Sequence, residues 1–200
     1  DDPHFIIGTM HTTGGIMVGR FFLNHRINAP AQNITADGDI SDWTNTDALF
    51  IGSESQTQAS FRAATDAGNL YLLVERRDVY VSTGDNVDLY IHNNEGNSLN
   101  TNSLKITIGP TGMVASAKWS GSSWETVDAS IFSVASKISG VIDDSRADNG
   151  YLSEIRIPLS AINASGNYFR FNAVLTEGGI KDTFTFADTE KPETWMLIKK

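Results

Sequence analysis

The sequence predicts an all-β protein: an antiparallel, jelly-roll-like β-sandwich with one short helical turn and a strand-rich N-terminal extension. Short apolar or alternating runs follow one another along the chain, and clusters of Gly, Asn, Asp and Ser separate them. The 17 glycines in 200 residues suit a chain with many tight turns. Strand-like runs do not alternate regularly with helical ones, which disfavours a parallel α/β sheet.

Residues 1–33 form the predicted extension. Apolar runs at 5–7, 16–18 and 21–23 are separated by glycines, and residues 29–33 are typical of a linker. Three interpretations remain open: strands packed on the sandwich, the tail of a preceding module, or a donor segment that completes the sheet of a neighbouring subunit.

Residues 34–200 form the predicted sandwich. Within it Leu104, Ile106 and Ile108 alternate with polar residues, so one face of that strand is expected in the core. Pro158 should end a strand because it lacks the N–H of a central ladder, and residues 158–162 are predicted to form the helical turn. The strands are expected at 49–51, 58–64, 70–75, 87–92, 104–108, 113–119, 124–127, 151–157, 168–175, 183–186 and 195–198.

Charge and composition exclude several classes of function. The formal net charge of −9 disfavours nucleic acids and anionic membranes, which bind basic surfaces. The chain has no cysteine, which rules out disulfides, thiolate metal sites and cysteine-based catalysis. No nucleophile-elbow, P-loop, Rossmann or zinc-protease motif is present, and we therefore expect a non-catalytic protein. No run approaches the roughly 20 apolar residues that a transmembrane helix needs, so we expect no membrane insertion.

Five segments in order resemble the family 9 carbohydrate-binding modules and related DOMON-like β-sandwiches. They are ITADGDISDW (34–43), ASFRAATDAGNLYLLVERRD (59–78), GDNVDLYI (84–91), YLSEIRIPLSAI (151–162) and TWMLIKK (194–200). The resemblance implies a secreted or cell-surface domain, of bacterial type, that binds glycan or polysaccharide. Such a domain would hold a larger polysaccharide-acting protein on its polymer.

In family members two loop tryptophans clamp a sugar ring. The matching loops here, 81–84 and 187–193, contain no tryptophan. We therefore predict that Trp119 and Trp124, which flank the turn at 120–123, form the stacking platform, with Tyr80 on a second surface. The alternative is a cross-strand pair that stabilises a hairpin by roughly 0.5–1 kcal/mol.

The two other tryptophans, Trp43 and Trp195, are expected in the core.

Acidic turns suggest a calcium site. Asp37, Asp39 and Asp42 lie at nearly alternate positions of a glycine-containing turn, and Ca²⁺ prefers six to eight oxygen ligands. The same side chains could instead accept hydrogen bonds from their own turn. Structural Ca²⁺ is the one cofactor that the sequence suggests.

Two other functions remain open. The protein could be a structural subunit of a filament or surface assembly, joined to neighbouring modules or to copies of itself by strand donation from residues 1–33. It could also be a haem-binding sandwich, with Met113 and Lys118 as candidate ligands.

Overall fold

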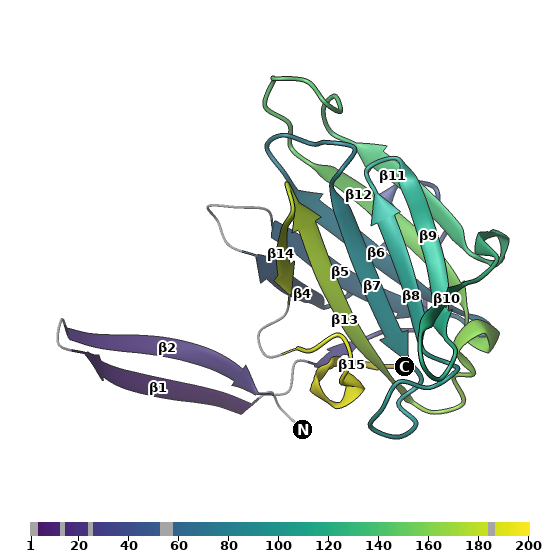
Figure 1. Ribbon diagram of the computed structural model, residues 1–200, viewed down its shortest axis with the longest axis horizontal. Helices are drawn as coiled ribbons and strands as arrows, with labels where there is room; N and C mark the ends of the chain where they lie inside the picture. The colour runs from purple at the N-terminus through teal and green to yellow at the C-terminus, as the bar shows by residue number, and fades with distance from the viewer. Residues whose placement is uncertain (1–3, 13–14, 24–25, 53–57, 184–186) are drawn as a thin grey trace.

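Two β-sheets pack face to face in the computed structural model, which describes residues 4–12, 15–23, 26–52, 58–183 and 187–200 (Figure 1). Neighbouring strands are antiparallel except for one parallel pair, β15 with β3. The predicted β-sandwich is therefore confirmed.

The larger sheet has eight strands in the order β10-β9-β8-β7-β13-β15-β3, and β14 also pairs with β13. Its strands are β3 (Arg26–Asn28), β7 (Asn86–His92), β8 (Leu104–Gly109), β9 (Gly112–Trp119), β10 (Trp124–Thr126), β13 (Tyr168–Glu177), β14 (Ile180–Thr183) and β15 (Met196–Lys199).

The smaller sheet has five strands in the order β11-β12-β6-β5-β4. Its strands are β4 (Ala48–Gly52), β5 (Gln58–Thr65), β6 (Asn69–Arg77), β11 (Ser133–Ile138) and β12 (Tyr151–Pro158).

The main core lies between the two sheets and follows from the alternation of the strands. Leu104, Ile106 and Ile108 of β8 are fully buried, as predicted, and face inward together with the alternate residues of β7, which pair with them. Phe61 of the smaller sheet meets Phe171 of the larger one with ring centroids 5.4 Å apart. Burial of such side chains is the main force that holds the layers together.

Most predicted strands are present, but two were missed. Strand β11 has the sequence SVASKI, which lacks a strong apolar alternation because it pairs at the edge of the smaller sheet. Strand β3 has only three residues. A strand was expected at 183–186; β14, Ile180–Thr183, shares only Thr183 with it, and residues 184–186 lie outside the described ranges.

The predicted helical turn after β12 is confirmed as the short 3₁₀ helix η3 (Leu159–Ile162). The other short turns are η1 (Ile40–Asp42), η2 (Ala129–Ile131) and η4 (Pro192–Thr194). Among the described residues, none of the helices has the length and apolar character needed to span a bilayer.

The N-terminal segment contributes to two different structures. Strands β1 (His4–Thr12) and β2 (Gly15–Leu23) form an antiparallel hairpin that extends sideways from the sandwich (Figure 1). The chain then enters the sandwich, because Ile27 is 3% exposed in β3 and Ala29 is fully buried. The backbone N–H of Gln32 donates to the carbonyl oxygen of Thr65, and the N–H of Thr65 donates to the carbonyl oxygen of Pro30. Residues 26–33 are thus part of the packed sandwich, whereas the role of the hairpin stays a prediction.

The segment that contains η1, residues 34–43, covers part of the outer face of the smaller sheet. Trp43 packs there in a second, smaller core with Tyr71 and Leu73, which confirms its predicted burial. The fully buried Glu154 of β12 accepts hydrogen bonds from Trp43 Nε1 at 2.6 Å and from the backbone N–H groups of Asp37 and Gly38. Burial raises the pKa of Glu154, although these bonds oppose the rise.

Asp66 closes the turn between β5 and β6. Its carboxylate accepts hydrogen bonds from the N–H groups of Gly68 and Asn69 and from the Tyr71 hydroxyl, at 2.6–2.7 Å. Burial alone would raise the pKa of Asp66, but the bonds from Asn69, Tyr71 and the backbone outweigh it and lower the pKa to about 2. The strands expected at 58–64 and 70–75 flank this turn, and the Asp66 carboxylate explains why it forms.

We predict that Asp66→Asn lowers the free energy of unfolding at pH 7 by about 1–2 kcal/mol, because charged acceptors make the stronger bonds. The folded pKa is depressed, so this contribution is present above the usual value of 3.8 and is lost as the pH falls toward about 2. Urea unfolding between pH 2 and pH 7 measures it, with Glu125→Gln on the exposed part of β10 as control. If wild type and Asp66→Asn lost the same free energy of unfolding between pH 7 and pH 2, the acid-sensitive contribution would not come from Asp66.

We also predict that Glu154→Gln lowers the free energy of unfolding by about 2–4 kcal/mol. An amide offers one acceptor oxygen to three donors and adds a buried N–H₂ group. Chemical denaturation followed by tryptophan fluorescence measures the loss. The exposed Glu190→Gln is the control and should change stability little. A cost below about 0.5 kcal/mol would mean that the carboxylate does not hold the covering segment in place.

Candidate functional site

An aromatic pair lies on the outer face of the larger sheet. Trp119 of β9 and Trp124 of β10 are register partners, and their rings meet edge to face with centroids 5.6 Å apart. Both side chains are half-buried, so part of each ring reaches solvent. The structure therefore brings together the two tryptophans that the sequence singled out, and it also realises the cross-strand pair of the alternative.

The pair continues into a buried aromatic cluster. Trp124 contacts Tyr90 of β7 at 5.8 Å between centroids, and Tyr90 contacts Trp195 at 5.9 Å. Tyr90 and Trp195 are 7% and 4% exposed, which confirms the predicted burial of Trp195. Leu99, in the loop after β7, packs against the same cluster. Only the Trp119–Trp124 end of this row of rings is open to a ligand.

Fixed polar groups lie beside the aromatic row. Lys105 of β8 pairs with Asp88 of β7 at 2.9 Å, and its Nζ lies 5.4 Å from the Tyr90 ring centroid. Burial lowers the pKa of Lys105, but the bond to Asp88 and the charges of Asp88 and Tyr90 outweigh it, and the net shift is upward. Thr107 donates to Asp88 at 2.6 Å. Sequence reasoning missed these partners, since only the β7–β8 register shows that Lys105 lies opposite Tyr90.

Tyr80 lies away from this pair. It is 60% exposed in the loop before β7, whereas Trp119 lies next to Ser103, at the other end of the larger sheet. The structure therefore does not join Tyr80 to Trp119 and Trp124 in one site. A role for Tyr80 on a second surface stays a prediction.

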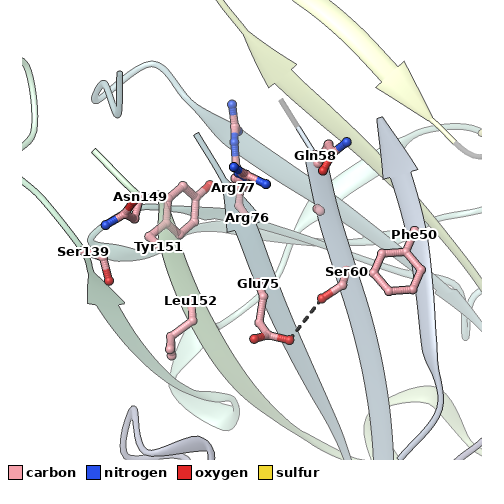
Figure 2. Close-up of a pocket in the computed structure, with 11 residues that line it drawn as sticks. Phe50, Gln58, Ser60, Glu75, Arg76, Arg77, Ser139, Asn149, Tyr151 and Leu152 are labelled. Atoms are coloured by element: carbon pink, nitrogen blue, oxygen red, sulfur yellow. Dashed lines mark hydrogen bonds between the residues drawn. The ribbon is translucent and has the colours of Figure 1, made fainter. Parts of the chain in front are cut away.

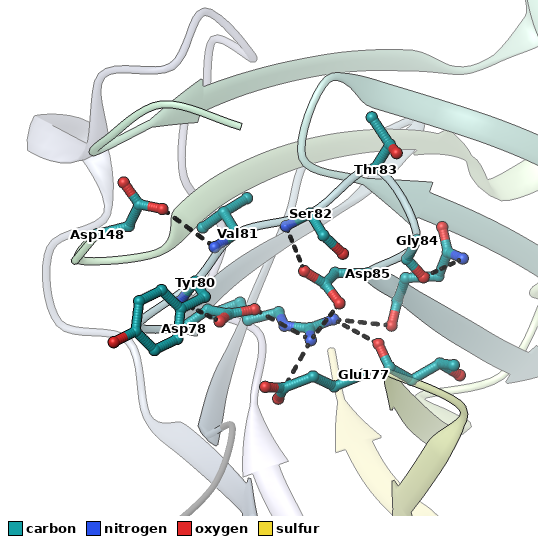
Figure 3. A network of polar contacts seen from close by, with 12 residues as sticks. Asp78, Tyr80, Val81, Ser82, Thr83, Gly84, Asp85, Asp148 and Glu177 are labelled. Carbon is teal, nitrogen blue, oxygen red and sulfur yellow. Dashed lines mark hydrogen bonds and ion pairs between the residues drawn. The ribbon is translucent and has the colours of Figure 1, made fainter. Parts of the chain in front are cut away.

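The loop that carries Tyr80 is organised by a buried arginine. Arg76 is 2% exposed and donates to the carbonyl oxygens of Asn86 and Thr176 at 3.1 and 3.0 Å. It also forms ion pairs with Asp78, Asp85 and Glu177 at 3.2–3.7 Å (Figure 3). Every bond of this network joins strands or loops of the sandwich to one another, so its role is structural.

The predicted calcium loop is held by hydrogen bonds within its own turn. The carboxylates of Asp37, Asp39 and Asp42 accept from the N–H groups of Asp39, Ser41 and Thr35, respectively, at 2.8–3.0 Å. Within the described ranges, no group of three His, Cys, Asp or Glu side chains is arranged to hold a metal ion. Asp42 Oδ1 is buried and has no hydrogen-bond partner in that part of the chain. The calcium site stays a prediction.

The candidate haem ligands lie on one strand. Met113 packs against the main core, and Lys118, which follows on the same strand, is half-buried. His92 is fully buried, and its ring meets Trp195 edge on and bonds to the loop after β7. Burial lowers the pKa of His92. This histidine therefore supports the aromatic cluster from within.

Comparisons with known proteins define the fold. No protein-family model matches the sequence, and no curated protein matches it. Among the solved structures that match are two of a family 9 carbohydrate-binding module from Caldicellulosiruptor kristjanssonii, one in complex with cellotriose and one with glucose. Each has a TM-score of 0.66 and 19% sequence identity, and the match covers 87% of this chain and 92% or 94% of the other. This chain thus has the β-sandwich fold of the family 9 carbohydrate-binding modules.

Proposed function

We propose that this protein binds carbohydrate through Trp119 and Trp124, without catalysis. The observation that carries the proposal is the half-exposed aromatic pair beside the Lys105–Asp88 ion pair. Aromatic faces bind the C–H faces of sugar rings, and charged or polar groups bind their hydroxyls. The cellotriose and glucose in the two similar structures support a sugar as the ligand.

The proposed biological role is to hold a larger, secreted polysaccharide-acting protein on its polymer. A binding domain of this kind raises the local concentration of an attached enzyme and needs no chemistry of its own. The formal net charge of −9 is compatible with binding to a neutral polysaccharide. It repels polyanionic polymers from most of the protein surface.

We predict that Trp119→Ala abolishes retention on insoluble polysaccharide and lowers the melting temperature little, because the aromatic contact found for Trp119 is that with Trp124. Trp124→Ala should also abolish retention, with a larger loss of stability, since Trp124 additionally covers Tyr90. Pull-down on cellulose and other polysaccharides, with thermal melts, measures both.

Val114→Ala is the matched control, since Val114 is on the same strand and 63% exposed. If Trp119→Ala retained full binding, the aromatic pair would only stabilise the β9–β10 hairpin.

A structural role in an assembly is the second candidate. The hairpin of β1 and β2 favours it, because within the described sheets each of these strands pairs only with the other and keeps one edge open. Two-stranded hairpins are at best marginally stable in water, and an open edge can accept a strand of another subunit.

We predict that, if the hairpin joins subunits, removing residues 1–24 converts an oligomer into a monomer. This deletion keeps β3 and the buried Ile27, so the sandwich should stay folded. Size-exclusion chromatography with light scattering, together with a thermal melt, measures both properties. A full-length protein that is already monomeric would rule out the assembly role.

A further inference from the structure

A second candidate site lies on the opposite side of the molecule. The outer face of the smaller sheet has a hollow of about 430 Å³, within the range of roughly 300–1,000 Å³ typical of small-molecule sites (Figure 2). It is separate from the aromatic pair, which belongs to the other sheet. The strand residues that matter for its chemistry are Phe50, Gln58, Ser60, Glu75, Arg77 and Leu152.

The register of four strands explains why these side chains meet. Phe50 of β4 pairs with Ser60 of β5, Ser60 with Glu75 of β6, and Glu75 with Leu152 of β12. The four residues therefore form one row across the sheet, on the face opposite the main core. Gln58 and Arg77 pair in the next row on the same face.

Phe50 gives the hollow an aromatic wall. It is 73% exposed, although its neighbours Leu49 and Ile51 are buried in the main core. An aromatic ring that stands free beside hydrogen-bonding groups suits a ligand with both apolar faces and hydroxyl edges. Leu152 adds a half-buried apolar surface on the far side of the row. This mixture is the one that sugar rings require.

The charges of the lining select the kind of sugar. Glu75 is already engaged, since it accepts from Ser60 at 3.1 Å and pairs with Arg62 at 3.4 Å. Arg76 points inward into its own ion-pair network. Arg77 is exposed, and it makes no ion pair with any residue that the structure describes. Within the described residues, the Arg77 guanidinium is therefore the unengaged cation of the hollow, in a chain whose net charge is −9.

We propose that this hollow binds an acidic oligosaccharide, with a uronate carboxylate on Arg77 and a sugar ring on Phe50. A guanidinium can hold a carboxylate through two parallel hydrogen bonds, which a neutral hydroxyl cannot match. Gln58 and Ser60, next to these residues, provide hydrogen-bonding groups for the ring hydroxyls. The site is independent of Trp119 and Trp124 and does not rest on the function proposed for them.

Isothermal titration calorimetry on the full chain tests the proposal with three probes: tetramers of galacturonate, of mannuronate and of glucuronate. We expect at least one to bind, and its methyl ester to bind about tenfold or more weakly, because the charge-assisted pair is lost. Raising the salt concentration should weaken binding to the acid form and leave the ester unaffected.

Variants separate this site from the aromatic pair. Arg77→Gln and Phe50→Ala should each weaken binding about tenfold or more, whereas Arg77→Lys should retain part of it. Arg26→Gln, an exposed arginine of the other sheet, and Trp119→Ala should leave it unchanged. The side chains of Arg77 and Phe50 are both exposed, so thermal melts should show that the variants at these two positions are folded.

Three results would overturn the proposal: no binding of any of the three acidic tetramers, equal binding of acid and ester, or full binding by Arg77→Gln. Loss of uronate binding in Trp119→Ala alone would assign the acidic ligand to the aromatic pair instead. Failure at this hollow would leave binding of neutral glycan at Trp119 and Trp124 untouched.

Discussion

The buried guanidinium of Arg76 is the constraint on which one end of the sandwich depends. It belongs to the smaller sheet, yet it donates to carbonyl oxygens of β7 and β13 in the larger one. A buried cation needs compensation, which Asp78 and Asp85 supply from the same loop. The ring of Tyr151 lies 5.7 Å from the guanidinium carbon. Gly150 has φ +95°, and a Cβ atom there would come within 1.9 Å of the Arg76 carbonyl oxygen. Arg76 therefore fixes both the distance between the two sheets at this end and the path of the loop that carries Asp78 and Asp85.

A second buried charge plays the same part on the outer face of the smaller sheet. Glu154 holds the segment that carries Trp43, and this segment covers Tyr71 and Leu73. One half of that face is thereby closed, while the half around Phe50 and Arg77 stays open as a hollow. The acidic residues of the covering segment thus have a clear structural use, since their carboxylates shape the turn that brings Trp43 to Glu154.

The two proposed binding surfaces differ in chemistry because they belong to different sheets. On the larger sheet, half-exposed tryptophans lie beside a lysine and a carboxylate that already neutralise each other, which suits a neutral sugar. On the smaller sheet, one phenylalanine stands beside an arginine that has no counter-charge among the described residues. A sandwich exposes both faces and buries only the layer between them, so such a fold can carry two unrelated sites.

The sequence alone was enough to predict the sandwich, most of its strands and the meeting of Trp119 and Trp124. Alternation of apolar residues and the short turn at 120–123 are local signals, and local pairing follows from them. Tertiary structure decided the rest. Residues far apart in the chain create the Arg76 network and the Glu154 anchor, and the row from Phe50 to Leu152 crosses four strands. Such contacts depend on strand order and register, which no local pattern encodes.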